Sequence, residues 1–169
     1  MSDLSIRMAT SSDLPRLQEI YNHYVVHTAI TFDLEPVTLE NRRAWFSQFA
    51  PLGRYRLWVA ECDRRVQGYA SSHSFRPRRA YETTVEPSVY CAPDGCGRGI
   101  GRALYTALFA GLADEDIHAY VAGITLPNEA SVRLHARFGF TPVGIMHSVG
   151  RKFGTYWDVG WYEKLRATP

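Results

Sequence analysis

The chain has few cysteines. Its 169 residues include three, Cys62, Cys91 and Cys96, and no two of them form a Cys-x-x-Cys pair. This pattern indicates neither a disulfide framework, which needs paired cysteines, nor a cysteine-based zinc site. We therefore expect reduced thiols, a cytoplasmic location and no bound metal.

A large excess of charge and long apolar segments are also absent. Lys and Arg number 19 and Asp and Glu number 17, which gives a formal net charge of +2 at pH 7. A dedicated nucleic-acid-binding protein usually carries a much larger basic excess. No apolar run comes near the roughly 20 residues that cross a bilayer, and the first residues lack a signal-peptide pattern. We expect no nucleic-acid partner and no membrane association.

The composition is that of a globular domain. Hydrophobic residues make up 46% of the chain and charged residues 21%, and a chain of this length buries a core without cross-links. Strands are expected near residues 5–8, 57–62, 66–70, 83–90, 120–124, 142–147 and 156–163, and helices near 14–24, 38–49, 103–114 and 128–138. We predict one α/β domain over residues 1–169, with a mixed sheet and a core of about residues 5–165.

A glycine-rich turn lies between the strand that ends near Tyr90 and the helix that follows. Its sequence, Cys96-Gly97-Arg98-Gly99-Ile100-Gly101-Arg102, directs several backbone N–H groups one way at a helix N-terminus. Such a turn suits phosphate oxygens. Arg102 stands where a Walker A loop needs lysine, and the third glycine of a dinucleotide-binding turn is missing. The alternative is a turn that only tightens the strand–helix junction, which does not need three glycines.

The turn resembles the phosphate-binding motif of the GCN5-related N-acetyltransferase (GNAT) superfamily, Gln/Arg-x-x-Gly-x-Gly/Ala, which holds the pyrophosphate of acetyl-CoA. Asn128 and the segment 133–140 resemble the start and the end of the superfamily's next helix. The likeness extends from Ile6 to Glu163. It implies a mostly antiparallel central sheet with a splayed strand pair and flanking helices. Residues 80–90, 126–135 and 152–160 narrow the resemblance to the phosphinothricin and methionine sulfoximine acetyltransferase branch.

The resemblance implies acetyl-CoA as co-substrate and assigns its binding residues. In the superfamily the strand before the turn pairs with the pantetheine arm of the cofactor. The residues assigned to the cofactor are Val89, Tyr90, Cys91, Gly97, Arg98, Gly99, Ile100, Gly101, Arg102 and Asn128. Cys96 departs from the motif, which has Gln or Arg at that position. A nucleophilic role for Cys96 is the alternative, but no histidine near it in the sequence provides the activating partner that such a role requires.

Acetyl transfer to an amine requires a base, because a protonated amine cannot attack a thioester. Glu86 matches the branch's catalytic glutamate, and the adjacent Pro87 favours a break in strand pairing because proline has no N–H to donate. His135 resembles a second acid/base group of the branch, with an ordinary pKa suited to that task. The alternatives are a solvated glutamate on a strand face and a helix histidine that only packs.

Two arginines resemble the branch's anion clamp. Arg76 and Arg78 would hold the anionic groups of a small amino acid, because a guanidinium group matches oxyanion geometry. The full set of substrate-binding residues implied is Phe32, Arg76, Arg78, Tyr81, Glu86, Ser88, Thr125 and Val159. Thr125 stands where phosphinothricin enzymes carry glycine, so its bulk puts phosphinothricin itself in question. A solvated basic loop is the alternative for the arginines.

These residues favour an acetyl-CoA-dependent enzyme that acetylates the α-amine of a small amino acid or analogue by direct transfer. The first alternative is an acetyltransferase for peptide or protein N-termini or for polyamines. The second is a non-catalytic acetyl-CoA-binding module, which would not need Glu86 and His135 together. The branch also implies a homodimer.

Overall fold

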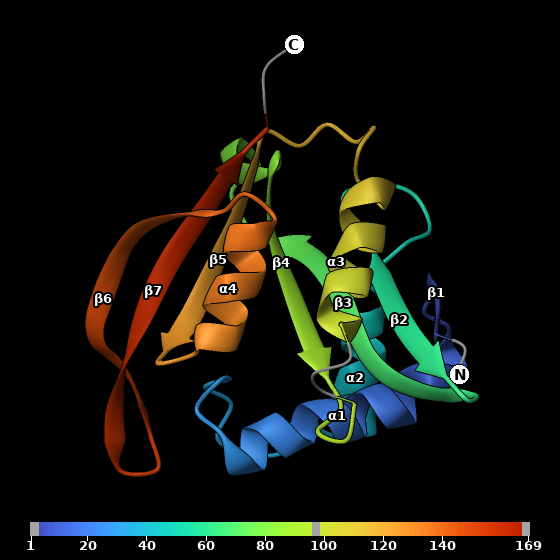
Figure 1. Cartoon of the computed structure of the whole chain (residues 1–169), viewed down its shortest axis with the longest axis horizontal. Coiled ribbons are helices and arrows are strands. Elements are labelled where there is room, and N and C mark those ends of the chain that lie inside the picture. Colours follow the sequence, from blue (N-terminus) through green and yellow to red (C-terminus); the bar gives the residue numbers. More distant parts are fainter. Residues whose placement is uncertain (1–3, 96–98, 167–169) are drawn as a thin grey trace.

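The computed structural model describes residues 4–95 and 99–166 (Figure 1). Cys96, Gly97 and Arg98, expected at the phosphate-binding turn, lie outside the described residues. The strands are β1 (Leu4–Met8), β2 (Leu57–Cys62), β3 (Arg65–Ser74), β4 (Thr84–Cys91), β5 (Ala119–Leu126), β6 (Thr141–Lys152) and β7 (Thr155–Leu165). The helices are α1 (Leu14–His27), α2 (Leu39–Phe46), α3 (Ile100–Gly111) and α4 (Glu129–Arg137), with short 3-10 turns η1 (Ser11–Asp13) and η2 (Arg79–Tyr81).

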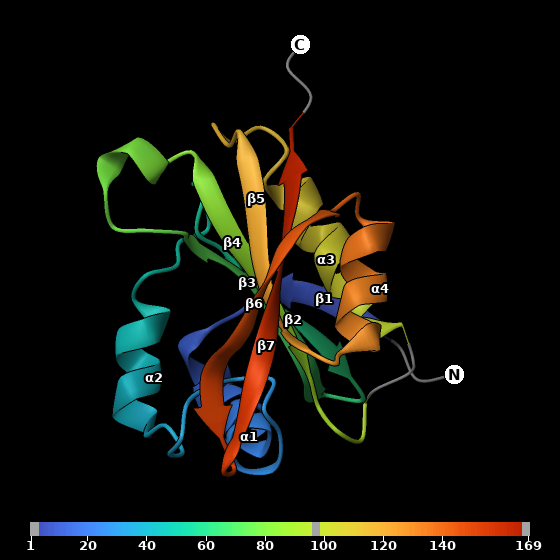
Figure 2. The ribbon, with the colours of Figure 1, turned by 90° about the vertical axis from the view of Figure 1, so that its left-hand side faces the viewer.

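The strands form a seven-stranded sheet in the order β1-β2-β3-β4-β5-β7-β6. The β4–β5 pair is parallel and the other described pairs are antiparallel. Helices α1 and α2 cover one face of the sheet, and α3 and α4 cover the other (Figure 2). This arrangement confirms the predicted mixed α/β fold with flanking helices.

Each face of the sheet has its own hydrophobic core. Under α3, Leu104 and Leu108 pack with Val85 and Tyr120 of the sheet, all buried. On the other face, α1 buries Leu17 and Ile20 against Leu57, Val59 and Tyr69. The two cores hold β3 and β4 from both sides, because side chains that alternate along a strand face opposite ways. No helix in the described ranges has the length and apolar character to span a membrane.

Several element bounds differ from the sequence-based expectation: α3 begins and ends three residues earlier, and β3 continues to Ser74 instead of ending near residue 70. Helix α2 ends at Phe46 instead of near residue 49, because the chain turns there and the Ala50 N–H donates to the carbonyl of Tyr55. Strand β6 continues to Lys152 instead of ending near His147. A register shift between Met146 and Gly150 absorbs extra residues while pairing with β7 resumes beyond it.

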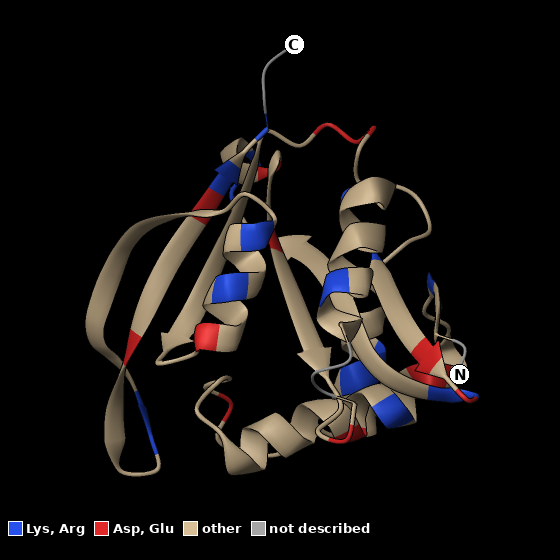
Figure 3. Cartoon of the chain, in the orientation of Figure 1, with Lys and Arg blue, Asp and Glu red and all other residues tan. Residues whose placement is uncertain are grey.

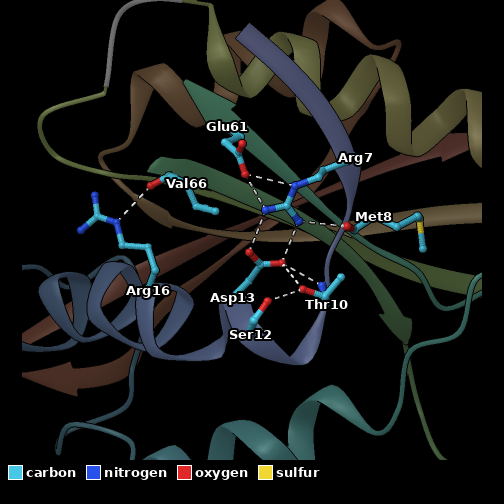
Figure 4. A network of polar contacts seen from close by, with 8 residues as sticks. All are labelled: Arg7, Met8, Thr10, Ser12, Asp13, Arg16, Glu61 and Val66. Atoms are coloured by element: carbon cyan, nitrogen blue, oxygen red, sulfur yellow. Dashed lines mark hydrogen bonds and ion pairs between the residues drawn. The ribbon is translucent and has the colours of Figure 1, made fainter. Parts of the chain in front are cut away.

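The N-terminal elements are joined by one cluster of charges (Figure 4). The Arg7 guanidinium on β1 donates two hydrogen bonds to the buried Asp13 carboxylate, both at 2.8 Å, and also binds Glu61 of β2. Burial raises the pKa of Asp13, but hydrogen bonds from Arg7 and Thr10 outweigh it and leave the pKa below its usual value. The cluster therefore fixes the start of α1 against β1 and β2.

Candidate active site

Strands β4 and β5 separate soon after they meet. Their parallel register pairs Thr84 with Ala119 and Val85 with Tyr120, and no further β4–β5 pair forms in these two fully described strands. On its other edge, β4 stays paired with β3 along its length, from Val85 to Cys91. Beyond Val85 the edge of β4 that faces β5 is therefore left open. This is the splayed strand pair that the sequence resemblance implies.

A cavity of about 240 Å³, here called the β4–β5 cavity, lies in the opening. It is lined by Pro87–Cys91 of β4, Ala122–Thr125 of β5, Gly101 and Tyr105 of α3, Asn128, Ala130, Ser131, Leu134 and His135 at α4, and Tyr24 and Ile30. Seven residues expected at the cofactor or the substrate therefore meet here with His135: Ser88, Val89, Tyr90, Cys91, Gly101, Thr125 and Asn128.

The N-terminus of α3 borders this cavity. Gly99 caps the helix in the left-handed region, at φ 77°, which favours glycine, and no side-chain cap is found for α3 among the described residues. Gly101 lies so close to α4 that a Cβ added to it would stand 3.3 Å from Leu134 Cδ2. Among the described residues, no side chain occupies the first N–H groups of α3, which suits an external acceptor. Ile100 and Arg102 are also expected at the cofactor, but neither lines the cavity: Ile100 is buried in the core and Arg102 is exposed.

Asn128 and Gly139 delimit α4 as the sequence predicts. The Asn128 side chain accepts a hydrogen bond from the Ser131 N–H at 3.1 Å, and Gly139 follows the helix at φ 85°. These caps set the rotation of α4, which points Ser131, Leu134 and His135 at the β4–β5 cavity.

Glu86 lies where β4 and β5 separate. Its carboxylate lies just beyond the last β4–β5 pair, close enough to the Gly123 N–H of β5 for that group to act on its pKa. Burial raises the pKa of Glu86 above its usual value, while the positive charge of Arg76 and the Gly123 N–H act in the opposite direction. Glu86 is therefore a half-buried carboxylate with a raised pKa, which suits proton transfer.

His135 is 4% exposed and both of its ring nitrogens have partners. Nδ1 lies 2.8 Å from the Ser131 carbonyl, which can only accept, so Nδ1 carries the proton. Nε2 lies 3.0 Å from the Tyr105 hydroxyl and accepts its hydrogen bond. Burial lowers the pKa of His135 and raises that of Tyr105, so the pair is neutral near pH 7. Tyr105, which the sequence reasoning missed, also lines the cavity.

The other expected substrate residues lie on the loop between β3 and β4 and on strands β5 and β7. Arg76 follows β3, and its guanidinium stands over the Phe75 ring at 4.9 Å. Phe75 in turn contacts the rings of Tyr81 and Trp161. Arg78 precedes η2 and is exposed. Val159 of β7 is the register partner of Thr125 on β5, so these two expected substrate residues are neighbours.

Phe32 is held against the β6–β7 hairpin. A Cβ added to Gly150 of β6 would overlap the Phe32 ring, so the ring occupies the space that a side chain would need. The buried Lys152 fixes the same loop by donating from Nζ to the Thr31 carbonyl at 2.8 Å. The described residues contain no group of His, Cys, Asp or Glu side chains arranged to hold a metal.

Comparisons with known proteins agree on one family. A family model described as an acetyltransferase (GNAT) domain matches residues 6–161. A phosphinothricin N-acetyltransferase of Streptomyces coelicolor is 52% identical over 165 residues, 96% of each chain. An L-methionine sulfoximine/L-methionine sulfone acetyltransferase of Pseudomonas aeruginosa is 41% identical over 155 residues, 92% of this chain and 90% of the relative. The structure of a phosphinothricin acetyltransferase from Sinorhizobium meliloti, in complex with AcCoA, superposes with a TM-score of 0.91 at 31% identity, covering 96% of this chain and 88% of that one.

The contact between Phe32 and Gly150 yields a stability test with a matched control. Gly150→Ala should destabilise the protein by about 1–3 kcal/mol, because the new methyl group overlaps the Phe32 ring. Gly144→Ala, on the same strand, meets nothing within 4 Å and should change stability by less than about 0.5 kcal/mol. Urea unfolding of both variants measures the difference. Equal stabilities would show that Phe32 does not rest on Gly150.

Proposed function

The chain belongs to the GNAT acetyltransferase family, and on that premise we propose that it transfers acetyl from acetyl-CoA directly to the α-amine of a small amino acid or analogue. The phosphinothricin and methionine sulfoximine acetyltransferases among its relatives support this substrate class. The observation that carries the proposal is the opening between β4 and β5, where the edge of β4 and the N-terminal turn of α3 border one cavity and the half-buried Glu86 stands at the point of strand separation.

Acetyl-CoA fits the β4–β5 cavity by the chemistry of its lining. The edge of β4 that β5 leaves at Val89 can pair with the amides of a pantetheine arm, as an added strand does, and Tyr90 and Cys91 continue the cavity wall beyond it. The uncapped N-terminus of α3 offers N–H groups to a pyrophosphate. A Cβ added at Gly101 would press on Leu134 of α4. The bound co-substrate supplies the thioester that the amine attacks.

Glu86 acts as the base, through a water molecule. It accepts the proton that the ammonium group of the acceptor must lose, after which the nitrogen attacks the thioester carbon and the C–S bond breaks. The nitrogen loses a second proton as the amide forms, and the departing thiolate gains one by way of the Tyr105 hydroxyl, which gives its proton to the sulfur and regains the nitrogen's proton. His135 orients this hydroxyl through Nε2. His135 therefore assists through Tyr105, because neither of its own nitrogens is free of a partner in the described structure.

The acceptor is a small anionic amino acid. Arg76 is close enough to Glu86 to act on its pKa, so an acceptor anion bound by Arg76 stands near the base. Arg78 and Tyr81 add donors from the same loop, and Phe32, Ser88, Thr125 and Val159 form the remaining walls. A polyamine fits less well, because a polycation is repelled by the two arginines. A peptide N-terminus is the remaining alternative. A binding module without activity would not require the Glu86–Gly123 contact.

The protein forms a homodimer through β6. This edge strand pairs with β7 alone among the described strands. Val143, Ile145, Met146 and Val149 on it are all about half exposed or more, and most of β6 carries no charge (Figure 3). A long, apolar, uncharged edge strand favours association, because single soluble chains usually protect such edges with charge.

Glu86→Gln tests the base. We expect kcat for methionine sulfone to fall by about 100- to 10,000-fold, because the amide cannot accept a proton. In the wild type, kcat/KM falls as the pH drops through the pKa of Glu86, which burial raises. That acid limb should disappear in the variant, while the titration of the acceptor amine remains. Glu82→Gln, an exposed neighbour, is the control. Unchanged turnover at every pH would contradict the assignment.

Removal of the two arginines distinguishes the substrate classes. Arg76→Ala with Arg78→Ala should raise the KM for methionine sulfoximine by about 10- to 100-fold, because two charge-assisted hydrogen-bond donors are lost. The KM for acetyl-CoA should not change. Arg79→Ala, exposed in the same loop, should have little effect. A double variant with unaltered KM would favour a peptide or polyamine acceptor.

Sedimentation equilibrium tests the dimer. Ile145→Lys places a charge on the exposed face of β6 and should weaken association at least about ten-fold. Leu52→Lys, at an exposed apolar residue outside β6, should leave the dimer intact. A wild-type protein that is monomeric at micromolar concentration would overturn this part of the proposal.

A further inference from the structure

A second cavity, also of about 240 Å³, lies on the face of the sheet covered by α1 and α2. Its walls include Arg42, Tyr69, His73, Ser88 and Tyr90. We call it the Arg42 cavity. None of the roles proposed above explains why it contains a buried cation.

Arg42 has no anionic partner in the described part of the chain. Its residue is 5% exposed, and its buried Nε has no hydrogen-bond partner among the described residues. The guanidinium group stands over the rings of Tyr21, at 3.9 Å, and Trp45, at 4.6 Å, which stabilise a cation but do not satisfy the Nε–H donor. Burial of a charged group with open donors is costly unless a ligand completes its hydrogen bonds.

A second buried donor faces the same space. Tyr69 is 1% exposed, and its hydroxyl also has no hydrogen-bond partner in the described residues. Burial raises the pKa of Tyr69 well above its usual value, so the hydroxyl keeps its proton. Burial, together with the charge of Arg42, lowers the pKa of His73 to about 4, so that ring is neutral near pH 7. Asp33 also lines the cavity, where it accepts the Tyr21 hydroxyl at 2.8 Å.

The Arg42 cavity meets the proposed acetyl-transfer site at Ser88. Ser88 lines both cavities, and it lies two residues from Glu86 on β4, so the two side chains project from the same face of the sheet. Its hydroxyl bonds to Ser71 at 2.9 Å, which bonds to His73 at 2.7 Å. A small molecule with one end beside Glu86 can therefore extend past Ser88 toward Arg42.

We propose that the Arg42 cavity binds an oxyanion of the acceptor, with Arg42 and Tyr69 as donors, in addition to the anion held by Arg76 and Arg78. This inference rests on the proposed function. Two anion sites suit an acceptor with negative charge at both ends, such as phosphinothricin, whose carboxylate and phosphinate groups share the chemistry that a guanidinium group recognises.

Kinetics with two acceptors test the inference. Arg42→Met keeps the length and apolar packing of the side chain but removes its donors. It should raise the acceptor KM by about 10- to 100-fold and leave the KM for acetyl-CoA unchanged. Arg43→Met, at the adjacent exposed position of α2, is the matched control and should change neither. A rise for both methionine sulfone and phosphinothricin identifies the carboxylate as the bound group. A rise for phosphinothricin alone identifies the phosphinate.

Two further measurements keep the test decisive. Tyr69→Phe removes only a hydroxyl group and should raise the same KM about three- to ten-fold, even if Arg42→Met fails to fold. Calorimetric titration of phosphinothricin into the wild type and the variants, without acetyl-CoA, measures binding independently of turnover. If phosphinothricin binds more tightly to the wild type than to the variants, the anion site is supported. If no amine is acetylated, only the proposed function is contradicted. Equal KM and equal binding in wild type, Arg42→Met and Tyr69→Phe would overturn it.

Discussion

The parallel pairing of β4 and β5 ends after two residue pairs, and the arrangement of the site depends on where it ends. Pro87, two residues beyond the last pair, has no N–H to donate, so β4 cannot continue an ordinary ladder with β5 through that position. The Gly123 N–H of β5 acts on the pKa of the Glu86 carboxylate instead. The residue proposed as the base therefore stands at the point where the two strands separate.

Because β4 is held from both faces, it can serve two cavities at once. Its side chains alternate, and the backbone edge between them remains open toward β5. On the α3–α4 face, Tyr105 and His135 form a neutral hydrogen-bonded pair beside the β4–β5 cavity. On the α1–α2 face, Ser88, Ser71 and His73 form a second polar chain. The strand therefore separates the proposed thioester side from the proposed acceptor side, with Ser88 at the boundary.

Features that depend on local sequence could be predicted, and those that depend on distant contacts could not. The glycine after α4 and the Asn128 cap follow from backbone preferences that the sequence displays directly. In the sequence, Tyr105 is only one of several residues on the apolar face of α3. Its hydrogen bond with His135 depends on how α4 packs against α3, which the sequence does not show. Arg42 stands in an Asn-Arg-Arg run that is typical of a solvated helix face, and its burial follows from the docking of α2 on α1 and β3. The position of the Phe32 ring depends on Gly150, which lies more than a hundred residues away in the sequence.

The electrostatics of Glu86 link acceptor binding to proton transfer. In the free protein, burial raises the pKa of this carboxylate and Arg76 partly opposes it. An acceptor oxyanion paired with Arg76 cancels much of that positive charge, which raises the pKa of Glu86 further. A stronger base removes the ammonium proton more readily, provided that it is still ionised near neutral pH. On the proposed assignment, Glu86 therefore becomes a better base only when an anionic acceptor is present, and an acceptor that lacks the anion loses both its binding contact and part of its activation.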